Sequence, residues 1–225
     1  MPGDTALPIV SVSEPRLVEP LNATRHEALH AHDEWDGEHL DGDDLSGNHA
    51  ESLEIVRCGF RGVRFTGSQL QHLRLVDVLA VDCELSGTIM SEASLRRVEF
   101  RNCRLGGLLL SDAKLRDVRF TECKIDDANF RFVTANRVVL DGCSLVDTDF
   151  TQATFTASAF WGCDLRTATF TKATMAGTRF GTSTLDGVRG ASALRGVVVG
   201  TDQVLPLALG LFGDLGIVIR DEEAT

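Results

Sequence analysis

Residues 111–130 read SDAKL RDVRF TECKI DDANF when they are divided into blocks of five, and each block ends on a large apolar residue. A period of five fits neither the 3.6-residue turn of an α-helix nor the two-residue alternation of a strand. An apolar residue recurs at this spacing without a break from Leu40 to Leu185. So long a period indicates a repeat architecture, in which each unit packs against its neighbours along one axis.

A small residue stands two positions before most of these apolar residues, and the small residues themselves repeat every 20 positions. A period of 20 indicates four blocks in one coil, so that residues i and i+20 stack at the ~4.8 Å spacing of parallel strands. Residues 38–187 then make about 7.5 coils and a rod ~36 Å long. The columns are Val78, Val98, Val118 and Val138; Cys83, Cys103, Cys123, Cys143 and Cys163; Ala93, Ala113, Val133, Ala153 and Ala173; and Thr88, Leu108, Ala128, Thr148 and Ala168.

The blocks Ser111–Leu115 and Asp126–Phe130 show the small, polar and large apolar positions most clearly, in the order A(D/N)Lxx. This pattern resembles that of the pentapeptide-repeat family, and the resemblance covers about two-thirds of the chain. It implies an all-β fold, a right-handed quadrilateral parallel β-helix with one pentapeptide on each face.

The repeat divides the chain into three segments. Residues 1–36 are expected to form an N-terminal extension or cap, residues 37–190 the β-helix, and residues 191–225 a C-terminal cap and dimerisation segment. Caps are expected because the two ends of a solenoid expose unpaired strand edges.

Local patterns predict the structure of both flanks. Residues 7–21 contain three prolines and are expected to be extended, whereas residues 22–29 carry a short helical pattern. Residues 202–213 are predicted to form a short capping helix that ends near Gly213. A terminal strand is predicted over residues 215–219.

The acidic residues are concentrated at the N-terminus. Residues 1–54 contain 13 acids and two bases and so account for the net charge of −11, whereas residues 55–225 balance 20 acids with 20 bases. No secretory signal is apparent, and the longest apolar run, residues 204–213, is about half of the ~20 residues that a membrane span needs. The sequence therefore predicts a cytoplasmic protein without membrane association or direct nucleic-acid binding.

The six cysteines all occupy the small inward position of the repeat. No C-x-x-C pair is present, and a column spacing of ~4.8 Å exceeds the Cβ separation of about 3.8 Å in a disulfide. We therefore expect buried, reduced thiols that pack as small apolar groups.

No pattern predicts a metal site or a catalytic site. Five histidines lie among the acids of residues 26–49, but their spacing matches no known metal site, and a solvated acidic cap is the favoured interpretation. A filled solenoid offers little concave space for a nucleophile and a base. The glycines recur at expected corners instead of forming a phosphate-binding loop: Gly62, Gly67, Gly87, Gly107, Gly142, Gly162 and Gly177. We expect a non-enzymatic protein without a cofactor.

The outward positions contain the candidate partner surface. A 20-residue spacing stacks Arg96 over Arg116 and Arg104 over Lys124, within a middle region where acids interleave with the bases. This favours a solvated ladder of mixed charge. Exposed apolar side chains mark contact sites in many proteins, and the candidates here are Ile89, Leu109, Phe132 and Trp161.

Two functions are compatible with these features. The first is a protein-interaction scaffold whose partner the sequence does not name. The second comes from a resemblance to the Qnr/MfpA-type quinolone-resistance proteins, which implies binding to DNA gyrase by mimicry of DNA. Because mimicry needs negative charge and residues 55–225 are neutral, it would depend on five acids of the first coils, namely Asp41, Asp43, Asp44, Glu51 and Glu54.

The same resemblance implies a homodimer that forms through the C-terminal segment. The expected interface is the apolar face of the short helix, with Val204, Leu207, Leu211 and Phe212.

Overall fold

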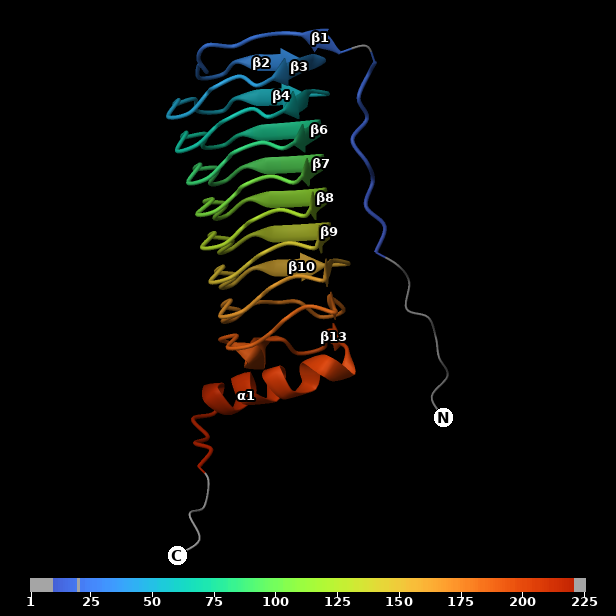
Figure 1. The fold of residues 1–225 in the computed structure, drawn as a ribbon, viewed down its shortest axis with the longest axis vertical. Helices are drawn as coiled ribbons and strands as arrows, with labels where there is room; N and C mark the ends of the chain where they lie inside the picture. The colour runs from blue at the N-terminus through green and yellow to red at the C-terminus, as the bar shows by residue number, and fades with distance from the viewer. Residues whose placement is uncertain (1–9, 20, 221–225) are drawn as a thin grey trace, which may run out of the picture.

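The computed structural model describes residues 10–19 and 21–220 as a parallel β-solenoid of about nine turns (Figure 1). Its strands belong to one 13-stranded sheet in which every neighbouring pair is parallel. A short helix closes the C-terminal end, so the predicted right-handed quadrilateral β-helix with a capping helix is confirmed. The strands are β1 (Asn22–Ala23), β2 (Glu34–Asp36), β3 (Glu38–Asp41), β4 (Glu54–Val56), β5 (Gly59–Arg61), β6 (Arg74–Val81), β7 (Ser94–Arg101), β8 (Lys114–Thr121), β9 (Thr134–Asp141), β10 (Thr154–Thr156), β11 (Ala159–Trp161), β12 (Arg179–Gly181) and β13 (Val198–Val199). The helices are the 3-10 helices η1 (Ala191–Ala193) and η2 (Thr201–Gln203) and the α-helix α1 (Val204–Asp214).

Neighbouring coils pair with the predicted offset of 20 residues. Leu95 pairs with Leu115 and Phe100 with Phe120 across β7 and β8. Isolated bridges, such as that between Arg104 and Lys124, extend the same register to the other two faces. Every coil is therefore bonded to the next on all four sides.

The corners of the solenoid need a left-handed backbone conformation every five residues. Gly62 and Gly87 have φ angles of 61° and 64° and adopt this conformation without the steric penalty of a Cβ atom. All seven glycines predicted to lie at corners have a positive φ. Other corners hold larger residues, such as Asp77 at 58° and Arg97 at 52°, so the repeat imposes the turn even where the residue does not favour it.

The core consists of the large apolar residues that end each block. Phenylalanines one coil apart stack face to face, with centroid separations of 5.0 Å for Phe100 and Phe120 and 4.9 Å for Phe160 and Phe180. These separations are set by the coil spacing, which lies in the range of favourable aromatic contacts. Ten of the twelve phenylalanines lie in this core and suit the geometry of the backbone.

The small inward residues satisfy backbone carbonyls of the preceding coil. Thr88 donates its hydroxyl to the carbonyl of Phe65 at 2.8 Å, and the Cys123 thiol lies 3.5 Å from the carbonyl of Phe100. Serine, threonine and cysteine can all supply this bond at the same position. The six cysteines are buried and free, as predicted, and burial raises the pKa of the Cys58 thiol to about 11.

The N-terminal end departs from the sequence predictions in two ways. The core column begins one block earlier than Leu40, because Trp35 pairs with Ile55 and is only 3% exposed. The helix predicted over residues 22–29 is wrong, since β1 lies there and pairs with β3. An isolated helix of eight residues is marginal in water, whereas the open edge of the first coil offers strand hydrogen bonds at once.

At the C-terminal end, the predicted capping helix is present as α1, but the predicted terminal strand is wrong. Residues 215–220 follow the helix without strand structure. The N–H of Leu215 bonds to the carbonyl of Leu211 at 3.0 Å, and that of Ile217 bonds to the carbonyl of Phe212 at 2.8 Å, so these residues complete the helix end. The sheet ends at β13, which pairs with β12.

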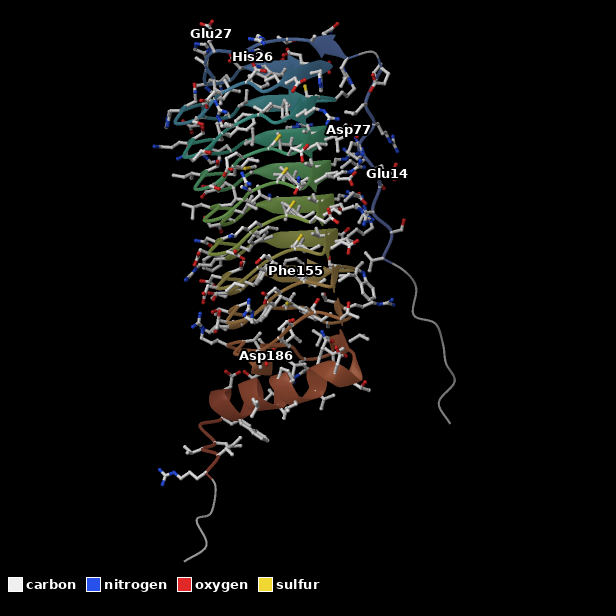
Figure 2. The ribbon with its side chains drawn as sticks, viewed as in Figure 1. Glu14, His26, Glu27, Asp77, Phe155 and Asp186 are labelled. Carbon is white, nitrogen blue, oxygen red and sulfur yellow. The ribbon has the colours of Figure 1, made fainter. Side chains whose placement is uncertain are left out.

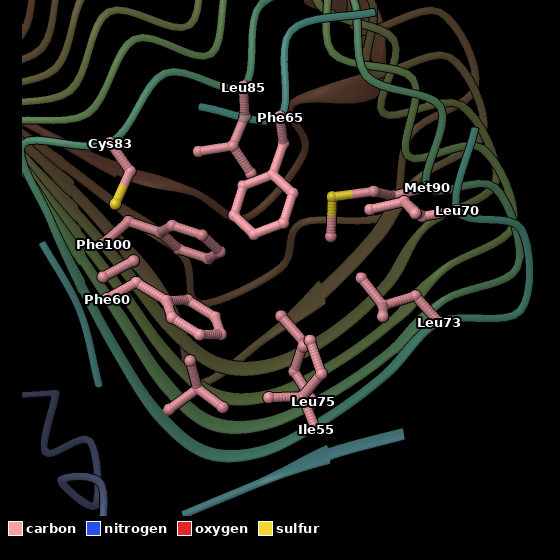
Figure 3. A pocket seen from close by; sticks show the side chains of 12 residues that line it. Ile55, Phe60, Phe65, Leu70, Leu73, Leu75, Cys83, Leu85, Met90 and Phe100 are labelled. Atoms are coloured by element: carbon pink, nitrogen blue, oxygen red, sulfur yellow. The ribbon is translucent and has the colours of Figure 1, made fainter. Parts of the chain in front are cut away.

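A small cavity lies where Ala80 interrupts a column of phenylalanines between Phe60 and Phe100 (Figure 3). Its volume is about 20 Å³, and its lining is apolar. We expect Ala80→Val to fill part of this space and to raise the free energy of unfolding by about 0.5–1 kcal/mol.

Thermal or chemical denaturation measures this change. Ala135→Val is the matched control, because Ala135 is equally buried but does not line the cavity, so that overpacking should lower stability there. If Ala80→Val and Ala135→Val lower the free energy of unfolding by the same amount, the cavity at Ala80 does not accommodate the larger side chain.

Candidate partner-binding surfaces

Three cations form a basic patch on one wall of the rod. Lys114 lies opposite Ser94, and Arg96 lies opposite Arg116, on the outward side of β7 and β8. All three side chains are exposed. Arg116 lies 3.9 Å from a carboxylate oxygen of Asp117, but within the described residues Arg96 and Lys114 have no ion pair. We call Arg96, Lys114 and Arg116 the basic patch.

The second predicted pair of stacked cations differs from this patch. Arg104 and Lys124 do stack. However, Arg104 lies 3.6 Å from Glu84, and Lys124 lies 3.7 Å from Asp126. This wall therefore carries a ladder of mixed charge, whereas the basic patch is only weakly neutralised.

The predicted apolar contact residues do not form one patch. Ile89 and Leu109 stack on another wall and are only half-buried. Phe132 occupies a corner, 41% exposed, with the Arg131 guanidinium 5.6 Å from its ring centre. Trp161 is 36% exposed, and its ring covers Gly181 of the next coil so closely that a Cβ atom there would lie 1.8 Å from it.

The five acids proposed for mimicry are spread around the first coils, and most are engaged. Asp44 lies 2.8 Å from Arg64, whose hydrogen bond holds the pKa of that carboxyl well below its usual range. Glu54 lies 3.2 Å from an Arg74 nitrogen. The remaining three are also separated: Asp41 at the end of β3, Asp43 almost buried, and Glu51 3.7 Å from His72. The structure does not gather them into one negative face.

One side of α1 is fixed to the end of the solenoid. Leu207 packs against the core, and the Gln203 side-chain amide donates to the Ser183 carbonyl at 2.6 Å. The Asp214 carboxylate accepts backbone hydrogen bonds from Gly190 and Ser192 at 3.1 and 2.8 Å. This side acts as a lid over the last coil.

The opposite side of α1 is apolar and open. Of the four predicted interface residues, Leu207 points to the core, whereas Val204, Leu211 and Phe212 are exposed. Leu205 and Leu209, which were not among the residues predicted from the sequence, are 67% and 48% exposed. In a helix of 3.6 residues per turn, positions 205 and 209 lie away from the buried Gln203, so this period could have placed both on the outer side. The exposed apolar residues of the helix are thus Val204, Leu205, Leu209, Leu211 and Phe212.

The histidines at the N-terminal end have structural partners. His26 stacks on Trp35 at 3.9 Å and lies 2.6 Å from a Glu38 carboxylate oxygen. No group of three or more histidine, cysteine or acidic side chains is arranged to hold a metal ion in the part of the chain that the structure describes. Within the same residues, no helix is long and apolar enough to cross a membrane.

The four-sided coils stack with residue i over residue i+20, and their interior is filled by apolar side chains. These features define a class of protein, the parallel β-solenoids built from five-residue units. The pentapeptide repeat region family matches residues 53–130 and 113–189. The chain therefore belongs to the pentapeptide-repeat family. A comparison with curated proteins found no match.

Several solved structures resemble the fold. A trypsin-treated variant of QnrB1, a plasmid-mediated fluoroquinolone resistance protein, is 20% identical and aligns over 86% of this chain and 100% of its own, with a TM-score of 0.52. Full-length QnrB1 is 22% identical over 82% of this chain and 99% of its own, with a TM-score of 0.39. HetL, involved in heterocyst differentiation regulation in the cyanobacterium Nostoc sp. strain PCC 7120, is 16% identical over 75% of this chain and 87% of its own, with a TM-score of 0.33. Likeness at these identities shows the fold alone.

Proposed function

We propose that the protein is a non-enzymatic scaffold that binds an acidic surface of a protein partner at the basic patch. The observation that carries this proposal is the exposure of Arg96, Lys114 and Arg116, of which only Arg116 lies near an acid, whereas the stacked cations Arg104 and Lys124 on another wall are both paired. Complementary charge steers association and fixes the register of an interface. A partner with acids at the ~4.8 Å coil spacing would match the stacked arginines.

The filled interior supports a function carried by the outer surface. The apolar cavity beside Ala80 has a volume of about 20 Å³, little more than one water molecule needs. The walls are continuously hydrogen-bonded from coil to coil. Side chains on such a wall keep fixed spacings, which lowers the entropy cost of binding.

Charge reversal tests the basic patch. We expect Arg96→Glu/Arg116→Glu to reduce capture of the specific partner from an extract of the source cells by at least ~10-fold, because attraction becomes repulsion. Affinity capture with quantitative mass spectrometry measures the loss.

The matched control is Arg104→Glu/Lys124→Glu, the same change on the wall of mixed charge, which should retain the partner. Equal capture by the wild type and both variants would contradict the role of the patch.

The open side of α1 supports a second part of the proposal, a homodimer that forms through the C-terminal helix. Five large apolar side chains of the helix are exposed there, and Leu215, Ile217, Val218 and Ile219 extend the apolar surface beyond it. Contiguous exposed apolar surface of this kind is typical of interfaces. A second copy would cover it with the same residues around a two-fold axis.

The dimer is tested by light scattering. We expect wild-type protein to have the mass of a dimer and Leu205→Asp/Leu209→Asp to weaken association by at least ~100-fold, because each substitution buries a carboxylate in an apolar contact. Val18→Asp, at a site 62% exposed outside the helix, is the control and should leave the mass unchanged. A wild type that stays monomeric at high concentration would overturn the interface.

A second candidate function is binding to DNA gyrase. It is supported by the likeness of the fold to QnrB1, which covers 86% of the chain with a TM-score of 0.52. The scattered, paired acids of the first coils favour the scaffold over mimicry of DNA.

Gyrase supercoiling, with and without a quinolone, decides between the two. The scaffold proposal predicts no inhibition and no protection from drug-induced cleavage at a large molar excess of this protein. Inhibition or protection would favour the gyrase-binding function instead.

A further inference from the structure

The N-terminal residues form a strap along the outside of one wall. Residues 10–19, which we call the strap, run beside the stacked coils from the level of β1 to that of β9 and β10 (Figure 1). Figure 2 shows Glu14 on the strap, beside the wall that carries Asp77. The strap has no strand or helix structure of its own, so its position depends on contacts with the wall.

Two backbone groups of the strap bind carboxylates of the wall. The N–H of Ser13 donates to Asp117 Oδ1 at 3.2 Å. The N–H of Arg16 donates to Asp77 Oδ1 at 2.9 Å. Hydrogen bonds to charged acceptors are stronger than those between neutral groups. The strap is therefore held in part by its main chain, and a peptide without proline at these positions can reproduce these two bonds.

The spacing of these bonds follows from the repeat. Asp77 and Asp117 lie two coils apart, which is ~9.6 Å at the spacing of parallel strands. Three residues of an extended chain, from Ser13 to Arg16, span ~10 Å. The wall thus presents acceptors at a distance that fits every third residue of an extended peptide.

The two carboxylates are built into the wall as acceptors. Asp77 and Asp117 are only 6% and 5% exposed. Arg97 Nε binds Asp77 at 2.5 Å, and Arg137 Nε binds Asp117 at 2.7 Å. The hydrogen bond from Arg137 outweighs burial and lowers the pKa of Asp117. Burial alone would raise the pKa of Asp77, but its hydrogen bonds from Arg97 and the backbone of Arg16 make the net shift downward.

The surface beneath the strap is partly apolar. Val139 and Ala159 point outward from β9 and β11, apart from the core, yet they are 2% and 0% exposed. Higher on the same wall, Leu17 of the strap, Gly59 and Leu79 help to line a crevice of about 120 Å³, with Leu21 beside Gly59. The strap does not fill this crevice, so a larger apolar side chain than that of Leu17 has room to enter.

We propose that this wall is a binding track for an extended peptide segment of a protein partner, and that the strap is its resident competitor. We define the track as Asp77, Asp117, Leu79 and Gly59. The preferred segment has free N–H groups three residues apart and a large apolar side chain at the position of Leu17. The proposal rests on the proposed scaffold function, because it assigns the partner a second point of contact.

The basic patch continues into the track around the corner of the solenoid. Arg116 of the patch lies 3.9 Å from Asp117 of the track. A partner could therefore place an acidic surface on the patch and an extended segment on the track at the same time. Two linked contacts bind more tightly than either alone.

Because the strap is covalently joined to the solenoid, it competes with partner segments for the track of its own molecule. A tethered segment has a high effective concentration at its site. The apparent affinity for a partner segment is the intrinsic affinity multiplied by the fraction of molecules in which the track is open. Loosening the strap should therefore raise the affinity for a free peptide.

The test removes the two N–H donors without changing the solenoid. Ser13→Pro/Arg16→Pro in the full chain deletes both strap hydrogen bonds, and proline is compatible with an extended segment. The probe is a fluorescent peptide with the sequence of residues 10–21, titrated with the full-length protein and followed by anisotropy. We expect it to bind the proline variant at least ~10-fold more tightly than the wild type.

Two further measurements make the result specific. Ser11→Pro/Val18→Pro is the matched control, since the N–H groups of these two residues have no hydrogen bond within the described chain, and it should bind like the wild type. A probe peptide that carries Leu17→Phe should bind the proline variant at least ~3-fold more tightly than the native-sequence peptide does, because phenylalanine fills the crevice.

Equal affinity for the wild type and the proline variant, or no binding to either, would overturn the track. If the basic-patch variant loses its partner while no peptide binds the track, the scaffold function stands and the track alone fails. A dimer that is lost in the proline variant but retained in Leu205→Asp/Leu209→Asp would assign the track to the strap of a second copy and refute a partner segment.

Discussion

The structure depends on the backbone hydrogen bonds that join each coil to the next with an offset of 20 residues. The N–H of Leu85 bonds forward to the carbonyl of Arg104 at 2.7 Å, and the N–H of Arg104 bonds back to the carbonyl of Cys83 at 2.9 Å. This offset places side chains of equivalent blocks directly over one another. Large apolar residues must then stack on large apolar residues, and a smaller one such as Ala80 leaves a cavity.

The same offset organises the charges outside. Where residues of opposite charge lie 20 positions apart in the sequence, they form ion pairs between neighbouring coils, as Arg97 does with Asp77 and Arg137 with Asp117. Where like charges recur, as at Arg96 and Arg116, pairing along the column is impossible. Residues 55–225 of this solenoid balance 20 acids with 20 bases, and its unneutralised columns are the places where another molecule can contribute the missing charge.

The non-repeating segments complete the molecule by contacts that the repeat cannot make. Trp35 and β1 close the first coil, and α1 closes the last with Leu207 and Asp214. Each closure leaves a surface exposed on its outer side. The apolar side of α1 is a consequence of ending a rod whose middle could continue without limit.

The four-sided solenoid, its inward residues and the burial of the six cysteines could all be predicted from the sequence, because in a repeat the spacing along the chain is also the spacing between contacts. The sequence also predicted the capping helix. Tertiary structure decided the strand at Asn22–Ala23, the absence of a strand over residues 215–219, and the direction of Leu207. It alone placed the strap on Asp77 and Asp117, 61 and 104 residues away from the groups that bind them. No period relates those segments, so only the folded wall, which presents two buried acceptors at the spacing of an extended chain, could bring them together.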